Sequence, residues 1–357
     1  MSFSTIPYNS SLNGTSTTFT RDLYTSGSIS NLTLGEGWTS ISGETFYQIM
    51  TLIAIEIPSS LTSIGMSAFY NAVNLNSFIF NNSQTSSLNS IGANAFFNAI
   101  RLTQVTIPAN VTSIGDRAFE NASGLTSITF DIGSKLANIN QRAFWGATGL
   151  TQINIPSTVT NIGENAFRNT TSLTQFIVDV NNNNYSHDSY GVLFNKNKTI
   201  LIQYPIGNTR TSYDIPSSVT SIEQNAFYGA TALTSINIPA SVTIIGVNAF
   251  AYMFNVSTFT VDASNPSYSS DTVGVLFNRN KTQLIQYPSG NNSTTYTIPT
   301  TVLSIVSNAF INSTKLTALS IDSTNNDFST DSGVLFDKYK TDLIHYPIGN
   351  TLSLIHI

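Results

Sequence analysis

Apolar and polar residues alternate along this chain in one pattern that is written many times. Its clearest copy is IPANVTSIGDRAF at 107–119, and close copies stand at 155–167, 215–227 and 238–250. The Ala-Phe pair that closes the pattern ends at Phe69, Phe96, Phe119, Phe144, Phe167, Phe227, Phe250 and Phe310. The shortest interval is 23 residues, from Phe96 to Phe119, and two intervals are 60 residues. A fixed period of this kind predicts a solenoid in which every repeat packs against its neighbours.

Each repeat predicts the same series of elements. The opening L-x-x-I-x-I, as in Leu102–Ile107, alternates like a strand with one buried face, and Pro108 then ends that strand. A second apolar pair follows at Val111 and Ile114, and Gly115 is predicted to permit a tight bend. We interpret the closing Gly-x-x-Ala-Phe as one or two helical turns that return to the core. The strands then form a parallel sheet, and the Phe residues form a stacked column.

These elements predict an α/β repeat solenoid with two regions. Residues 1–28 are a polar leader, expected to be either a cap or disordered, and 29–357 are the solenoid. The final letters YPIGNTLSLIHI drift from the pattern where the next Pro is due, so the sequence is expected to end within a repeat.

A small polar residue precedes the second apolar pair in most repeats. We predict that this ladder satisfies backbone donors at the turn. Its members are Ser60, Asn110, Thr158, Ser218, Ser241 and Thr301.

Three repeats, at 173–232, 256–315 and 316–357, contain extra sequence that is shared among them. The segments G-V-L-F and L-I-x-Y-P predict two strands, arranged either as a hairpin or as additional rungs of the solenoid. We favour additional rungs, because Tyr204-Pro205 and Tyr287-Pro288 imitate the ordinary Ile-Pro strand ending.

The same long repeats carry the motif D-x-x-N-x-x-(Y/F)-S-x-D. Its copies begin at Asp179, Asp262 and Asp322. Asp and Asn oxygens suit Ca²⁺, but the spacing matches no EF-hand and the bidentate Glu is missing. Asx turns that close a surface loop explain the same residues, and they are the favoured interpretation.

Composition narrows the function. Only 9% of residues are charged and the net charge is −5, which argues against nucleic-acid binding because that requires clustered Lys and Arg. There is no cysteine and no apolar run long enough to span a membrane. His187, His345 and His356 are the only histidines, and no nucleophile motif or metal spacing accompanies them. We therefore predict no catalysis, no cofactor and no bound metal.

The repeat L-x-x-I-x-I-P-x-S-V-T-S-I-G-x-x-A-F resembles the BspA-like, Treponema-type leucine-rich repeats over about 29–357. That resemblance implies a horseshoe with its parallel sheet on the concave side and short strands or helical turns on the convex side. It also implies exposure on a cell surface and adhesion to proteins or glycans of a host or matrix. No catalytic residue is carried over. The start of the chain shows no signal peptide, which favours an alternative, an intracellular scaffold of the same fold.

The x positions of L-x-x-I-x-I face away from the core and form a neutral, hydrogen-bonding surface with almost no charge after Glu56. Two interpretations stay open, because Thr also suits any solvent-facing strand. If the surface binds a partner, the candidate residues are Gln104, Thr106, Thr129, Gln152, Asn154, Gln175, Asn237 and Thr260.

Overall fold

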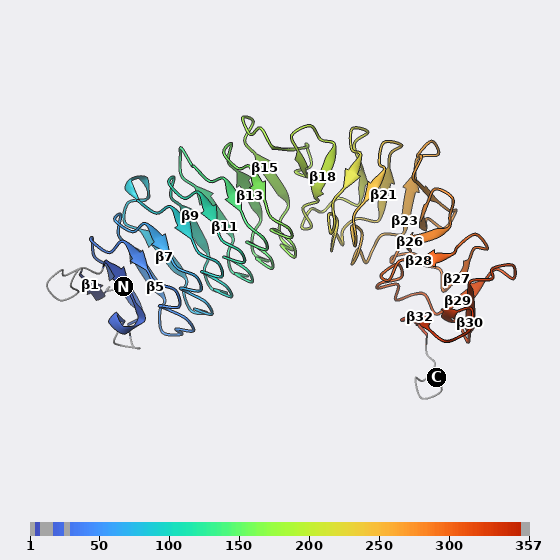
Figure 1. Ribbon diagram of the computed structural model, residues 1–357, viewed down its shortest axis with the longest axis horizontal. Helices are drawn as coiled ribbons and strands as arrows, with labels where there is room; N and C mark the ends of the chain where they lie inside the picture. Colours follow the sequence, from blue (N-terminus) through green and yellow to red (C-terminus); the bar gives the residue numbers. More distant parts are fainter. Residues whose placement is uncertain (1–3, 8–16, 25–28, 351–357) are drawn as a thin grey trace. The chain divides into compact units, whose positions relative to one another are not determined.

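The computed structural model describes residues 4–7, 17–24 and 29–350 and divides into two compact units, Met1–Lys196 and Asn197–Ile357. In each unit an ordinary repeat forms one coil of chain, and such a coil contributes strands to two rows (Figure 1). We call the row built from L-x-x-I-x-I the long-strand row and the row built from the second apolar pair the short-strand row. The remainder of each coil, around Ala-Phe, is the turn side.

The first unit contains both rows, and the strands that pair within a row are parallel, with equivalent residues of successive repeats in register. The pairs of its long-strand row fall into three separate sheets. Its long-strand row is β1 (Ser4–Ile6), β3 (Asn31–Leu34), β5 (Ala54–Ile57), β7 (Ser77–Phe80), β9 (Gln104–Ile107), β11 (Ser127–Phe130), β13 (Gln152–Ile155) and β15 (Gln175–Val178). Its short-strand row is β2 (Thr18–Phe19), β4 (Ser40–Ile41), β6 (Ser63–Ile64), β8 (Ser90–Ile91), β10 (Ser113–Ile114), β12 (Asn138–Ile139) and β14 (Asn161–Ile162). A hairpin follows, formed by β16 (Tyr185–His187) and β17 (Leu193–Asn195).

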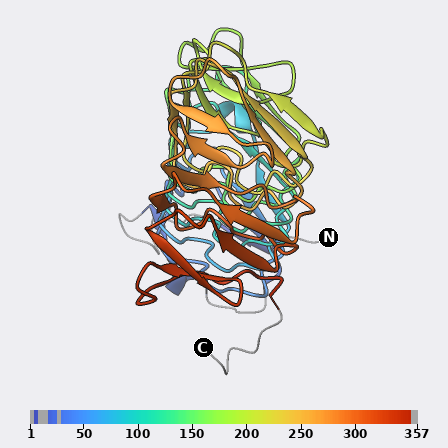
Figure 2. The same ribbon diagram turned by 90° about the vertical axis from the view of Figure 1, so that its right-hand side faces the viewer.

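The second unit repeats this arrangement, and Figure 2 turns it toward the viewer, with its strands following one another from yellow at the top through orange to red at the bottom. Its long strands are β19 (Ser212–Asp214), β21 (Ser235–Ile238), β23 (Thr258–Val261), β27 (Thr295–Ile298) and β29 (Ala318–Ile321). Its short-row strands are β18 (Ile200–Gln203), β20 (Ser221–Ile222), β22 (Ile244–Ile245), β26 (Gln283–Gln286) and β28 (Ser304–Ile305). The remaining strands are β24 (Tyr268–Ser270), β25 (Leu276–Asn278), β30 (Phe328–Asp331), β31 (Val334–Asp337) and β32 (Leu343–His345).

The predicted Phe column is confirmed inside each unit. The rings of Phe96, Phe119 and Phe144 are fully buried and nearly parallel, with centroids 5.0 and 5.4 Å apart. In the second unit Phe227 and Phe250 stack at 5.4 Å. Stacked aromatic rings bury a large apolar area, so this column forms the centre of the core.

The predicted α/β class and the helical turns are wrong. The only helical segments among the described residues are two short 3₁₀ turns, η1 (Arg21–Leu23) and η2 (Ser83–Thr85), and neither lies in an Ala-Phe segment. The segment around Phe69 consists instead of successive β-turns. The N–H of Ala68 bonds within its own coil, to Gly65, whereas the N–H of Phe69 bonds to Ala95 of the next coil. Alternate N–H groups are thus satisfied by the neighbouring repeat, which removes the need for a helix.

These turns require a left-handed backbone at one or two positions per coil. The residue there is most often Asn, which tolerates positive φ better than other non-glycine residues. The asparagines with positive φ are Asn71, Asn94, Asn98, Asn121, Asn165, Asn169, Asn225, Asn248 and Asn312.

The repeated glycines act differently from the prediction. Gly115 does not adopt a positive φ, so it is not needed for a bend in the left-handed region. A Cβ at Gly115 would lie 2.5 Å from the carbonyl carbon of Gly92 in the preceding coil. Glycine is therefore selected because the backbones of adjacent coils approach closely.

The long repeats contain both alternatives considered from the sequence. In the second unit β24, β25 and β26 form an antiparallel meander, and β26 also pairs in parallel with β28 as an additional rung. Tyr287 does not occupy the Ile-Pro place. Its N–H bonds to Ala309 O and its ring packs 5.6 Å from Phe310, so it takes the place of a column Phe.

The small polar ladder bonds mainly to backbone acceptors rather than to the predicted donors. Thr158 Oγ1 donates to Leu136 O at 2.7 Å, and Ser218 Oγ donates to Lys198 O at 2.9 Å. Ser60 does both, since its Oγ donates to Trp38 O and accepts the N–H of Gly37. Ser241 Oγ is buried and has no hydrogen-bond partner among the residues that the structure describes.

Both chain ends bear on predictions from the sequence. Residues 4–6 and 18–19 of the predicted leader pair with β3 and β4, respectively. Residues 1–3, 8–16, 25–28 and 351–357 lie outside the described residues. The expected end within a repeat falls on the last of these ranges and stays a prediction.

Candidate interaction surfaces

The long-strand row of the first unit presents the predicted side chains to solvent. Gln104, Thr129, Gln152, Asn154 and Gln175 are exposed. Thr106 is half-buried. Each lies beside a fully or nearly fully buried strand neighbour, because alternate residues of a strand point to opposite faces.

Equivalent residues of adjacent strands in this row bond to one another. Thr106 and Thr129 share a hydroxyl–hydroxyl bond of 3.0 Å, and Gln175 Nε2 donates to Gln152 Oε1 at 3.2 Å. The parallel register places these residues directly opposite each other. The result is a set of neutral donors and acceptors that is ordered before any partner arrives.

The second unit carries the remaining two candidates, Asn237 and Thr260, and both are exposed. Asn237 Nδ2 donates to a carboxylate oxygen of Asp214 on the adjacent strand. Asp214 was missed from the sequence, and it adds one negative charge to a face that was predicted to carry almost none after Glu56. It lies in the extra rung of a long repeat, where no L-x-x-I-x-I pattern marked the strand.

A glycine of each long repeat closes one edge of the long-strand row. The N–H of Phe176 donates to Gly191 O at 2.9 Å, so the chain before β17 occupies the position that a following strand would take. Gly191 has φ +74°, and a Cβ there would lie 2.4 Å from Gln175 Cβ. In the second unit Gly274 and Gly333 have the same relation to Thr258 and Ala318.

The Asn of each D-x-x-N motif is a buried structural group. Asn182 Nδ2 donates to Pro156 O at 2.8 Å and Val159 O at 3.0 Å. Its Oδ1 accepts the N–H groups of Asn184 and Tyr185, both at 2.8 Å. Asn265 and Asn325 repeat all four bonds. These Asn oxygens already accept backbone N–H groups. This supports the interpretation of the motif as an Asx turn over its interpretation as a calcium site.

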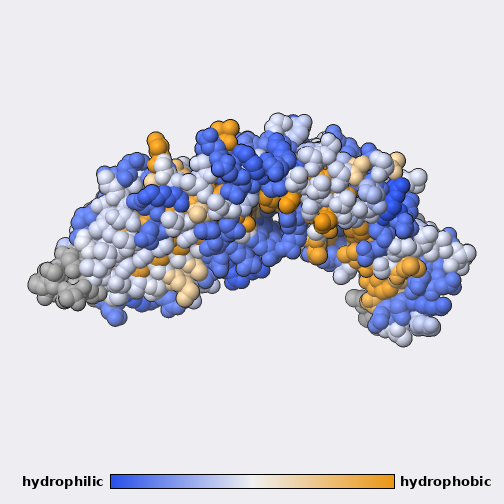
Figure 3. All heavy atoms as spheres, turned by 45° about the horizontal axis from the view of Figure 1, so that its top comes forward, coloured by the Kyte–Doolittle hydropathy of each residue, from blue (hydrophilic) through white to orange (hydrophobic). Residues whose placement is uncertain are grey.

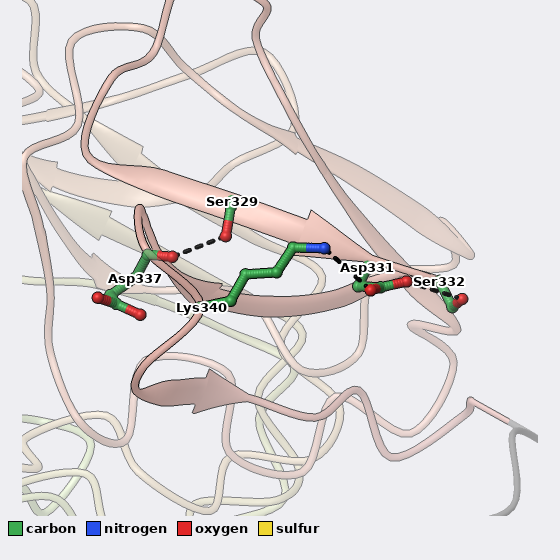
Figure 4. A network of polar contacts seen from close by, with 5 residues as sticks. All are labelled: Ser329, Asp331, Ser332, Asp337 and Lys340. Carbon is green, nitrogen blue, oxygen red and sulfur yellow. Dashed lines mark hydrogen bonds and ion pairs between the residues drawn. The ribbon is translucent and has the colours of Figure 1, made fainter. Parts of the chain in front are cut away.

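The last Asp of the motif also bonds inside the protein. Asp188 Oδ1 accepts the N–H groups of Tyr190 and Val192, each at 2.9 Å. In the third copy Asp331 Oδ2 forms a 2.9 Å ion pair with Lys340 Nζ, and Ser329 Oγ ties the same hairpin to Asp337 O (Figure 4). Within the part of the chain that the structure describes, no group of three or more His, Cys, Asp or Glu residues is placed to hold a metal.

Both described histidines serve packing or the backbone. His187 Nδ1 accepts the N–H of Val178 at 3.1 Å and so attaches the hairpin to β15. His345 stacks on Phe310 at 5.0 Å, and burial lowers its pKa to about 4. His356 lies outside the described residues.

A second row of side chains, on the turn side of the first unit, was missed from the sequence. Tyr47, Tyr70 and Phe97 stack in parallel with centroids 4.9 and 4.6 Å apart. Farther along, the guanidinium groups of Arg142 and Arg168 lie 4.5 and 4.7 Å from the ring centroid of Trp145. All are half-buried. The sequence did contain a signal for this row. Its members stand at fixed positions of the repeat, either directly after the column Phe or two residues before it.

Hydrophilic and intermediate residues dominate the face drawn in Figure 3, with apolar patches between them. In the second unit exposed apolar side chains include Ile244, Val247 and Leu303. No helix among the described residues is long and apolar enough to cross a membrane.

Known proteins share this arrangement. A family model of the BspA-type leucine-rich-repeat region, with six copies, matches residues 16–87, 84–198, 207–293 and 289–337. The crystal structure of the pneumococcal vaccine antigen PcpA is 26% identical and matches 77% of this chain with a TM-score of 0.62. The match covers 63% of the antigen's chain, so less than two thirds of its length is represented here.

A leucine-rich cell surface protein from Faecalibacterium prausnitzii A2-165 is 27% identical, with a TM-score of 0.57. The match covers 80% of this chain and 83% of that one. A comparison with curated proteins gave no match. The 23-residue coils, the register of their strands and the matched ranges together show that this chain belongs to the BspA-type leucine-rich-repeat family.

Proposed function

We propose that this chain is a non-catalytic adhesion or protein-interaction module on a cell surface, and that it binds proteins or glycans through its long-strand rows and the loops of its long repeats. One observation carries the proposal. The exposed side chains of β9–β15 form an ordered, neutral set of donors and acceptors held by buried neighbours. A partner that bonds to such a surface meets little loss of side-chain entropy, because the Gln152–Gln175 and Thr106–Thr129 pairs are already formed.

The surface location rests on similarity. The Faecalibacterium prausnitzii protein is described as a cell surface protein and the pneumococcal one as a vaccine antigen. Detection of the chain on intact, unpermeabilised cells by surface labelling tests this part. Labelling that appears only after permeabilisation would instead support the alternative, an intracellular leucine-rich-repeat scaffold.

The binding face is tested with a panel of immobilised matrix proteins and glycans, followed by matched variants on any partner found. Gln152→Glu places a charge in the centre of the long-strand row. Gln141→Glu makes the same change at an exposed residue of the turn side. We expect Gln152→Glu to weaken binding by about tenfold, the effect of one or two lost hydrogen bonds, and Gln141→Glu to leave it unchanged.

The aromatic and arginine row supplies the competing outcome. Trp, Tyr and Arg are the residues most enriched in interface hot spots, and the long-strand face has few of them. If Trp145→Ala removes binding while Gln152→Glu does not, the partner binds to the turn side and the assignment to the long-strand row is wrong.

A further inference from the structure

In the second unit the coils with Tyr204 and Tyr287 in the column place are shorter than their ordinary neighbours, and a cavity lies beside the second of them. In the ordinary coil seven residues, Ser304–Phe310, lead from the short strand to the column Phe. In the long repeat Gln283 pairs with Ser304, yet Tyr287 already occupies the column place, so five residues cover the same path. The outermost part of the turn is missing from this coil.

The missing residues leave a cavity of about 340 Å³ between the coil before and the coil after. Apolar side chains of Ile245, Phe250, Ile285 and Val306 form part of its lining, and no lining residue is charged. Asn308 Nδ2 donates to Asn248 Oδ1 at 2.9 Å across the gap, which confirms that coils 60 residues apart meet at this point.

Two backbone donors face the place of the missing turn. In the preceding coil the N–H of Asn225 bonds to Val247 O at 3.2 Å, and the N–H of Phe227 bonds to Ala249 O at 2.8 Å. The equivalent N–H groups are those of Asn248 and Phe250. Neither has a hydrogen-bond acceptor within the described residues of the chain. Such groups favour any ligand that supplies an acceptor.

We propose that this cavity binds a short, uncharged, extended segment of another polypeptide. The two donors are residues i and i+2 of their coil. In each ordinary coil that another ordinary coil follows, such a pair binds two carbonyl oxygens that are also two residues apart, as the N–H groups of Asn225 and Phe227 do. A peptide backbone presents carbonyls at that spacing, so the ligand replaces the part of the coil that is missing. A small apolar side chain of the ligand enters the cavity beside Phe250 and Val306. Because the lining has no charge, an internal segment fits better than a charged chain terminus.

This site is separate from the long-strand row, so it stands or fails independently of the adhesion proposal. The probe is the blocked tripeptide N-acetyl-Ala-Val-Ala-amide, added to the full chain labelled with ¹⁵N. We expect saturable downfield shifts of the Asn248 and Phe250 amide protons, with a Kd of about 1 mM for so small a ligand. The bonded amides of Asn225 and Phe227 should not move.

Matched variants separate this site from general association. Val247 lines the cavity and is 71% exposed, whereas Ile244 is 59% exposed on the same coil and is not part of the lining. We expect Val247→Trp to weaken the tripeptide by about tenfold or more and Ile244→Trp to have no effect. A second measurement on the unsubstituted chain is a crystal soaked with the tripeptide, which should place its carbonyl oxygens within hydrogen-bond distance of both amides.

Three results overturn the proposal. The first is an absence of shifts at Asn248 and Phe250 at saturating tripeptide, and the second is an equal response of the two Trp variants. The third is a response of these amides to N-acetylglucosamine but not to the tripeptide, which would identify a glycan subsite instead.

Discussion

Asn182 offers the most direct test of how the long repeats are held together. Its side chain is fully buried and makes four hydrogen bonds to backbone groups. Asn182→Asp keeps the shape but removes both donors, so a carboxylate would face the carbonyl oxygens of Pro156 and Val159. Loss of one partner from a buried polar or ionic arrangement costs about 3–5 kcal/mol, and we expect a loss of this size in the free energy of unfolding.

The pH dependence of this loss has a definite sign. Burial beside two carbonyls raises the pKa of the new carboxyl above its value in the unfolded chain. The folded variant therefore binds more protons than the unfolded one, and its stability falls as pH rises through the raised pKa. The difference from the unsubstituted chain should be smaller at pH 4 than at pH 7.

The measurement is urea unfolding followed by circular dichroism, with Asn183→Asp as the matched control. Asn183 is exposed in the same loop, and its change should stay within about 0.5 kcal/mol. Calcium provides the second arm, because a loop that bound it would gain about 2.7 kcal/mol at a hundred times the Kd. A loss below about 1 kcal/mol for Asn182→Asp, or recovery of its stability by calcium, would refute the structural assignment of this residue.

Three further measurements test other features. Phe119→Ala should lower the free energy of unfolding by about 3–5 kcal/mol in urea, and Phe119→Leu by clearly less, because the ring is buried between two stacked neighbours; equal losses would contradict a stacking contribution. His345 should titrate near pH 4 by NMR, so its contribution to stability declines as pH falls from about 6.5 to 4; His345→Gln should remove that decline, and a normal histidine pKa would show that the ring is hydrated. The amide of Asn248 should exchange with D₂O much faster than that of Asn225, and similar rates would mean that the Asn248 donor is bonded after all.

The sequence predicted the strands well because their burial is periodic. Val105 and Ile107 alternate with Gln104 and Thr106, and this alternation predicts a strand with the first pair buried and the second pair facing outward. The column Phe positions follow from the same period. The outward positions of the candidate face were therefore placed correctly, whereas their role in binding depends on a partner that the sequence does not contain.

The turn side was predicted wrongly because its hydrogen bonds join different repeats. A helix satisfies its N–H groups locally, and nothing in Gly-x-x-Ala-Phe states that Phe69 bonds to Ala95, which is 26 residues away. The Asn residues at Asn94 and Asn98 were the overlooked signal, since a left-handed backbone at two places in five residues excludes a helix. The Tyr287 place was missed for a related reason. Because this coil is two residues shorter, Tyr287 aligns in sequence with the Ile-Pro strand ending, although in space it lies in the Phe column.

The long repeats change what the long-strand row can do in each unit. Phe176 and Phe259 donate their N–H groups to Gly191 and Gly274, so each hairpin occupies the edge where a further strand would pair. Without the hairpin, the edge strand of the row would be free to pair with another chain. Two features require glycine at both positions. Each has a positive φ, and a Cβ there would lie too close to Gln175 or Thr258. Replacement by Ala would therefore displace the hairpin and open the edge. This closure explains the repeated G-V-L-F letters of the long repeats without a ligand, and the proposed binding face lies in the variable outward residues beside them.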